Sequence, residues 1–144
     1  MADFFEDLVF SPEDVITFPS GIPGFERRKR FVVVAMPQCE PFSWLVCVDG
    51  AAPALRFAII NPLVFIPEYS PNLTKEQLAE LNIGDVRDLM MFAIITIGDN
   101  PADSTANLAG PVIINKAAKL GKQVLLDDDR YSTQDSIIRK NDRC

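Results

Sequence analysis

Asp88-Leu-Met-Met-Phe-Ala-Ile-Ile-Thr-Ile97 is the most apolar run in the chain. Its length and its β-branched residues predict a buried central strand rather than a helix. Met90 and Met91 are adaptable side chains that can serve a binding surface, but filling a core is their commoner use. We therefore expect the fold to be organised around one extended strand buried in the core.

Shorter apolar runs lie on both sides of this segment, and turns rich in Pro and Gly separate them. Pro lacks a backbone donor and Gly accepts turn geometry, so this spacing favours short strands over long helices. Residues 63–69 are also expected to be extended, with Pro67 at a strand end. The other predicted strands are residues 15–18, 31–36, 42–48, 55–60, 112–114 and 122–127.

Helical signals are few. Thr74-Lys-Glu-Gln77 matches a capping box and predicts a short helix over roughly 75–82, which Gly84 ends. Residues 116–120 are expected to form one helical turn. The fold class is therefore mainly β, a small single-domain β-barrel or sandwich-like fold with one or two short helices. Residues 1–131 are expected to form this domain, and residues 132–144 a mobile or briefly helical C-terminal tail.

The 144-residue chain has 20 acidic and 14 basic residues and a net charge of −6. A general phosphate-backbone binder needs a concentrated positive surface, so this charge argues against nucleic acid and favours a protein partner. Arg27-Arg28-Lys29-Arg30 is the only dense basic run. We interpret it as a solvated entry to a strand, and a patch that contacts RNA is the alternative.

No histidine is present, which excludes Ser-His-Asp and Cys-His catalysis and histidine-ligated zinc. The three cysteines show no CxxC spacing. Asp127, Asp128 and Asp129 cannot all face one ion on an extended chain, because successive side chains alternate. No phosphate-binding glycine motif occurs either. We expect no enzymatic activity, no cofactor and no metal site.

The N-terminus lacks the positive segment and the apolar run of a signal peptide, and no 18-residue apolar stretch occurs. We therefore expect a cytoplasmic protein that does not enter a membrane. The first fourteen residues carry acidic side chains between aromatic and aliphatic ones, and no basic side chain. An edge strand with alternating charges is one interpretation, and an arm that a basic partner grips is the other. The acidic residues are Asp3, Glu6, Asp7, Glu13 and Asp14.

Three blocks of sequence, in order, resemble the FliW family of bacterial flagellar assembly factors. The resemblance extends over roughly residues 15–131, with Val46-Cys47 and Gly110 as departures from the usual pattern. The first block is Ile16-Thr-Phe-Pro-Ser-Gly-Ile-Pro-Gly-Phe-Glu26. The second is Pro41-Phe-Ser-Trp-Leu45 with Ala54-Leu-Arg-Phe57, Asn61-Pro62 and Phe65-Ile-Pro-Glu-Tyr69. The third is Thr105-Ala-Asn-Leu-Ala-Gly-Pro-Val-Ile-Ile-Asn115 with Gln123-Val-Leu-Leu126.

The resemblance implies a switch between two protein partners. FliW proteins bind flagellin, and they bind CsrA, a small dimeric RNA-binding protein that represses translation of flagellin mRNA. When flagellin is scarce, FliW holds CsrA and translation proceeds. A flagellin-specific chaperone that does not bind CsrA is the alternative. We expect a monomer, because the net charge discourages self-association, and no direct contact with nucleic acid.

Residues 61–69 are the segment that we expect to form part of the partner surface. The segment is extended and bounded by prolines, and it carries aromatic side chains of the kind that anchor interfaces. The candidate residues in it are Asn61, Phe65, Glu68 and Tyr69. The alternative is that Phe65 and Tyr69 belong to the core. Asp3, Glu6 and Asp7, with Glu13 and Asp14, are expected to steer CsrA electrostatically.

Overall fold

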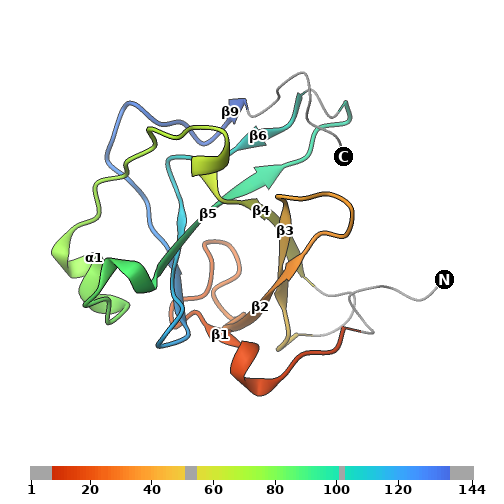
Figure 1. The fold of residues 1–144 in the computed structure, drawn as a ribbon, viewed down its shortest axis with the longest axis vertical. Coiled ribbons are helices and arrows are strands. Elements are labelled where there is room, and N and C mark those ends of the chain that lie inside the picture. The colour runs from red at the N-terminus through yellow and green to blue at the C-terminus, as the bar shows by residue number, and fades with distance from the viewer. Residues whose placement is uncertain (1–7, 51–54, 101–102, 137–144) are drawn as a thin grey trace.

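The computed structural model describes residues 8–50, 55–100 and 103–136 (Figure 1). Its sheet closes on itself at strand β5 (Leu89–Thr96), which has neighbouring strands on both sides. One side of β5 pairs with β4 (Arg56–Ile60), in the register Ile59 opposite Ile94. Its other side pairs first with β7 (Val112–Asn115) and then with β6 (Thr105–Ala106). The predicted central strand is therefore confirmed.

The pairing of β4 with β5 turns the sheet into a closed seven-strand barrel, in the order β4-β3-β2-β1-β8-β7-β5. The remaining barrel strands are β1 (Ile16–Thr17), β2 (Arg30–Ala35), β3 (Ser43–Cys47) and β8 (Leu120–Gln123). All neighbouring barrel strands are antiparallel except β1 and β8, which pair in parallel. The mainly β, barrel-like fold class is thus confirmed.

β5 packs against an apolar cluster on each of its faces, which explains why its sequence is continuously apolar instead of alternating. Met90, Phe92 and Ile94 pack against the cluster inside the barrel. Ala93 and Ile95 belong to a second cluster outside the barrel wall. Inside the barrel, Phe18 and Phe31 are fully buried and pack edge to face with ring centroids 5.0 Å apart. The other buried members of the inner cluster are Ile16, Ile22, Leu45, Cys47, Ile59, Val112 and Ile114.

Helix α1 (Lys75–Glu80) lies outside the barrel, and Leu81 at its C-terminal end belongs to one buried cluster with Ile113 of β7 (Figure 1). The predicted capping box is formed: Gln77 N donates to Thr74 Oγ1 over 3.1 Å, and Thr74 N donates to Gln77 Oε1 over 2.8 Å. The helix stops at Leu81 instead of Gly84, because Asn82 adopts a left-handed backbone with φ of 56°. The described residues also form three short 3₁₀ helices, η1 (Pro12–Asp14), η2 (Pro62–Val64) and η3 (Val86–Asp88).

Residues 63–69 are not a strand, so that expectation is wrong. Asn61 Oδ1 accepts a hydrogen bond from Leu63 N over 3.0 Å, and Pro62 occupies the first position of η2. An Asn followed by Pro is a favourable start for a helical turn, and this local signal overrides the apolar pattern. Because η2 turns the chain, the segment from Asn61 to Tyr69 folds back over the barrel wall instead of extending the sheet.

Two further boundaries differ from the sequence expectation. Residues 116–119 form a turn rather than a helical turn, because Asn115 Oδ1 accepts hydrogen bonds from Ala117 N and Ala118 N. The next strand, β8, therefore starts at Leu120 rather than residue 122. The expected tail begins at residue 132, yet β9 (Asp135–Ser136) pairs with β6, and Leu108 N donates to Ser132 O. Residues 137–144 lie outside the described part of the chain.

Within the described part of the chain, no helix has the length and apolar character needed to cross a membrane.

Gly121 tests the packing inside the barrel, because a Cβ atom there would lie 2.5 Å from Phe18 Cζ. We expect Gly121→Ala to lower the free energy of unfolding by about 1–3 kcal/mol, since the buried Phe18 ring has no free space to move into. A methyl group added at exposed Gly84 would meet no atom within 4 Å, so Gly84→Ala is the matched control and should stay within about 0.5 kcal/mol. Urea unfolding measures both. Equal midpoints for the two variants would contradict the packing described.

Candidate partner-binding surface

The segment from Asn61 to Tyr69 leaves the barrel where β4 ends and lies over the outer cluster (Figure 1). Phe65 and Ile66 are half-buried and pack against that cluster. Leu63 and Val64, in contrast, are 42% and 47% exposed. η2 therefore presents two adjacent aliphatic side chains to solvent on a backbone that is anchored on both sides.

Tyr69 is in the core, as the alternative interpretation stated. Its side chain is only 4% exposed, and its hydroxyl donates a 2.6 Å hydrogen bond to the carbonyl oxygen of Leu108. Burial raises the pKa of the Tyr69 phenol well above its usual value, so the ring stays neutral. A direct contact from Tyr69 to a partner would require the segment to open. The residue instead holds the segment against the barrel.

Asn61, Phe65 and Glu68 remain predicted partner residues, and the structure gives each a distinct position. Asn61 is exposed, but its side chain caps η2. Phe65 is half-buried in the outer cluster, and Glu68 is exposed. Sequence analysis missed Leu63 and Val64, because an apolar pair in an expected strand looks like core. The Asn-Pro start of a helical turn was the signal that could have exposed them.

A clamp formed by Asp128, Arg130 and Tyr131 fixes the far end of this segment. Tyr131 packs edge to face on Tyr69 with centroids 4.6 Å apart, and its hydroxyl accepts a hydrogen bond from Ser70 N. Arg130 lies 5.0 Å from the Tyr131 ring centroid and donates to Ser70 O. The Arg130 guanidinium also pairs with Asp128 at 2.7 Å and lowers the pKa of that carboxyl. Asp128 is therefore part of a clamp, not only of a solvated turn.

The acidic N-terminal residues are only partly described. Asp3, Glu6 and Asp7 lie outside the described residues, so their steering role stays a prediction. Glu13 and Asp14 are exposed in η1, and Asp14 Oδ2 accepts a hydrogen bond from Ser11 N. These two carboxylates therefore project from a short structured element just before β1.

Two residues of the basic run, Arg28 and Lys29, contact neighbouring loops of the fold. Lys29 Nζ donates to Pro19 O over 2.8 Å, and Lys29 N donates to Asp49 Oδ2 over 2.9 Å. The Arg28 guanidinium lies so close to Gly50 that a Cβ atom there would be 1.9 Å from it. Only Arg27 and Arg30 of the run are exposed. Half of this run thus packs against neighbouring loops, which suits a strand entry better than an RNA surface.

Cys47 is a buried free thiol in the described part of the chain. Its Sγ donates a 2.9 Å hydrogen bond to Asp49 Oδ1. Burial, followed by that hydrogen bond, raises its pKa to about 11, so the thiolate form is scarce at neutral pH. Nor does any group of three Cys, Asp or Glu residues gather to hold a metal ion in the described ranges.

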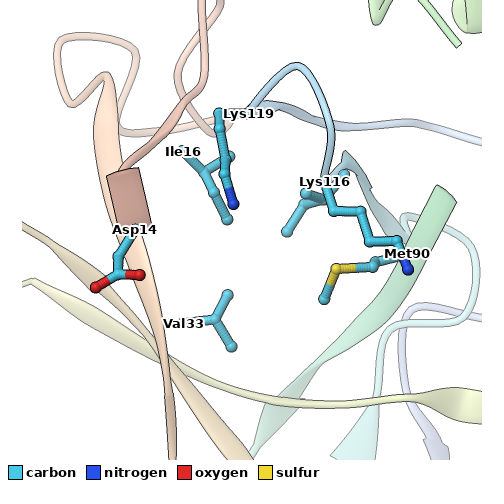
Figure 2. Close-up of a pocket in the computed structure, with 7 residues that line it drawn as sticks. Asp14, Ile16, Val33, Met90, Lys116 and Lys119 are labelled. Carbon is cyan, nitrogen blue, oxygen red and sulfur yellow. The ribbon is translucent and has the colours of Figure 1, made fainter. Parts of the chain in front are cut away.

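A hollow of about 320 Å³ opens at one mouth of the barrel (Figure 2). Apolar side chains from four strands form its floor, and Asp14, Lys116 and Lys119 lie around it. Sequence analysis did not find this site, because its residues are up to 105 positions apart in the chain.

The Tyr69 hydroxyl supplies a test of how the segment is held. Tyr69→Phe keeps the ring but leaves the buried Leu108 carbonyl without this donor, so we expect a loss of about 1–2 kcal/mol in unfolding free energy. Tyr131→Phe is the matched control, because it removes an exposed hydrogen bond and should cost less than about 0.5 kcal/mol. Urea unfolding followed by tryptophan fluorescence compares them. Tyr69→Phe with the stability of the wild type would contradict the role of the Tyr69–Leu108 hydrogen bond in holding the segment.

Comparison with known proteins gives a consistent result. The family model described as FliW protein matches residues 2–137. The flagellar assembly factor FliW of Alkaliphilus metalliredigens is 36% identical over 137 residues, which are 94% of this chain and 83% of that protein. The corresponding factor of Moorella thermoacetica is 35% identical over 142 residues, covering 98% and 89%. A crystal structure of a flagellar assembly factor FliW superposes with a TM-score of 0.84 at 34% identity, covering 93% of this chain and 92% of the other.

Proposed function

The chain belongs to the FliW family, and from that premise we propose that it is a non-enzymatic flagellar assembly factor that binds flagellin and antagonises CsrA. The observation that carries the proposal is the family match over residues 2–137. In this proposal, scarce flagellin leaves the protein free to hold CsrA, and flagellin mRNA is translated. Abundant flagellin occupies the protein, and CsrA returns to the message. The site of action is the cytoplasm, where both partners and the mRNA are present.

Charge supports the choice of partner. CsrA binds RNA and therefore needs a basic surface, whereas this chain has a net charge of −6. Opposite net charges speed the encounter of two proteins and favour a defined orientation. The same charge disfavours self-association, which supports action as a monomer. The protonated Cys47 thiol and the histidine-free sequence support a binding role rather than catalysis.

The exposed face of η2 is the part of the partner surface that the geometry supports best. Leu63 and Val64 lie on a short rigid element, so burying them in a complex costs little conformational entropy. Glu68, further along the segment, adds a negative charge in solvent. Aliphatic side chains with a charge close in sequence suit an interface that has an apolar centre and a polar rim.

Calorimetric titration with purified CsrA, repeated with flagellin already bound, tests the proposed switch. We expect binding to each partner alone and weaker binding to CsrA once flagellin is present. Binding to flagellin without any binding to CsrA would replace the switch with a flagellin-specific chaperone. Binding to neither partner would overturn the proposed function.

The η2 surface has its own test. Leu63→Ser combined with Val64→Ser should weaken binding to at least one partner by about tenfold or more, because apolar anchors in an interface carry much of its affinity. Ile97 is 60% exposed just beyond the end of β5, so Ile97→Ser is the matched control and should bind normally. Urea midpoints of both variants should match the wild type. Wild-type affinity of the double variant for both partners would remove η2 from the interface.

The acidic N-terminal residues are tested by rate measurements rather than affinity alone. Replacing Asp3, Glu6 and Asp7 by their amides should slow association with CsrA several-fold at low salt and flatten its dependence on salt. The dissociation rate should change little, because steering acts before contact is made. Stopped-flow mixing over a series of salt concentrations measures both rates. An unchanged association rate and salt slope would exclude the steering role.

A further inference from the structure

The hollow at the barrel mouth has an apolar floor that is continuous with the core. It is lined by Ile16 of β1, Val33 of β2 and Met90 of β5, which Figure 2 labels, and by Ile114 of β7. These four residues belong to, or pack against, the cluster inside the barrel. The volume of about 320 Å³ is at the small end of the range for pockets that bind a ligand. An apolar group the size of one side chain therefore fits on this floor.

Charged side chains stand around the hollow on opposite sides. Figure 2 shows Asp14 on one side and Lys116 on the other, with Lys119 between them at the upper edge. Neither lysine forms an ion pair with another described residue. The parallel pairing of β1 with β8 explains why Asp14 and Lys119 lie around the same hollow, because the residues that precede two parallel strands lie at the same end of a sheet. Asp14 precedes β1, and Lys119 immediately precedes β8.

The turn that carries both lysines is rigidly held. Asn115 is buried, and its Nδ2 donates to the carbonyl oxygens of Leu81 and Asn82 at 2.8 and 3.1 Å. Its Oδ1 accepts hydrogen bonds from the backbone N–H groups of Ala117 and Ala118 in the turn. Thr17 N donates to Lys119 O, and Lys116 N donates to Asp88 O. The backbone of the two lysines is thus fixed before any ligand arrives, which lowers the entropic cost of binding.

Lys119 occupies a backbone conformation that does not favour lysine. Its φ is 58°, in the left-handed region that Gly and Asn adopt more readily. A turn selected for stability alone would place Gly or Asn at this position. The geometry of the turn therefore does not explain why this residue is a lysine. Its position at the edge of the hollow does, because the ammonium group can there contact a bound ligand.

We propose that this barrel mouth binds the carboxyl-terminal residue of another polypeptide, with an apolar last side chain. The side chain rests on the floor made by Val33, Met90 and Ile114, and the terminal carboxylate lies between Lys116 and Lys119. Asp14, across the hollow, accepts a hydrogen bond from a backbone N–H of the bound chain. The apolar floor, the two positive charges and the acceptor on the opposite side match the last side chain, the terminal carboxylate and a backbone N–H of a chain end, respectively. The proposal rests on the barrel mouth alone and does not require the partners proposed above.

Peptide titrations of the full-length chain test this directly. The probes are acetyl-Ser-Gly-Leu with a free carboxylate, the same peptide as a carboxamide, and hexanoate. Amide and methyl NMR shifts report the site. We expect saturable shifts at Lys116–Leu120, Ile16 and Met90 with the free peptide, and affinity about tenfold weaker for the carboxamide. Equal affinity for both peptides, or no saturable shift at the mouth with the free peptide, would overturn the proposal. Tighter binding of hexanoate would assign the site to small carboxylic acids instead.

Two lysine variants separate binding from folding. Lys119→Gly removes the ammonium group and suits the positive φ, so the urea midpoint should stay equal or rise while peptide affinity falls about tenfold. Lys122 pairs with Glu80 away from the mouth, so Lys122→Gln is the matched control and should bind the peptide normally. Wild-type affinity of Lys119→Gly would overturn the assignment of the carboxylate site.

Discussion

The pairing of β4 with β5 is the constraint on which the rest of the structure depends. Three residue pairs, Ala58 with Ile95, Ile59 with Ile94 and Ile60 with Ala93, close the sheet into a barrel. Closure pairs β4, which would otherwise be a free edge of the sheet, with β5, and it encloses the Phe18 and Phe31 rings. It also fixes the point where the chain leaves β4, and so decides where η2 displays Leu63 and Val64.

Local signals in the sequence were enough to predict the elements that depend on local chemistry. The apolar, β-branched run gives β5, and Thr74 with Gln77 gives α1, because strand preference and helix capping act over a few residues. Closure of the barrel could not be read from the sequence, since it depends on register between strands far apart in the chain. The fold class was therefore predictable, but the choice between a barrel and a sandwich needed the structure.

The candidate sites were less predictable for the same reason. Asp14, Lys116 and Lys119 lie around the same hollow at the barrel mouth because β1 and β8 pair in parallel. No local sequence pattern predicts that pairing. Tyr is a residue type that often anchors interfaces, yet the Tyr69 hydroxyl donates a buried hydrogen bond to the carbonyl oxygen of Leu108. In the η2 segment, burial of Tyr69 and exposure of Leu63 follow from one helical turn that reverses the expected direction of the chain.

In this account the barrel is a rigid frame, and the proposed surface for flagellin and CsrA consists of side chains of η2 on its outside. Hydrogen–deuterium exchange of the full-length chain, alone, with saturating flagellin and with saturating CsrA, tests this most directly, and protection of residues 61–68 by either partner meets the prediction. The account predicts slower exchange of the amides in residues 61–68 and unchanged exchange in β4, β5 and β7. Faster exchange along the β4–β5 pairing, or no protection in residues 61–68, would contradict it, because the partner would then act by opening the barrel or by binding another face.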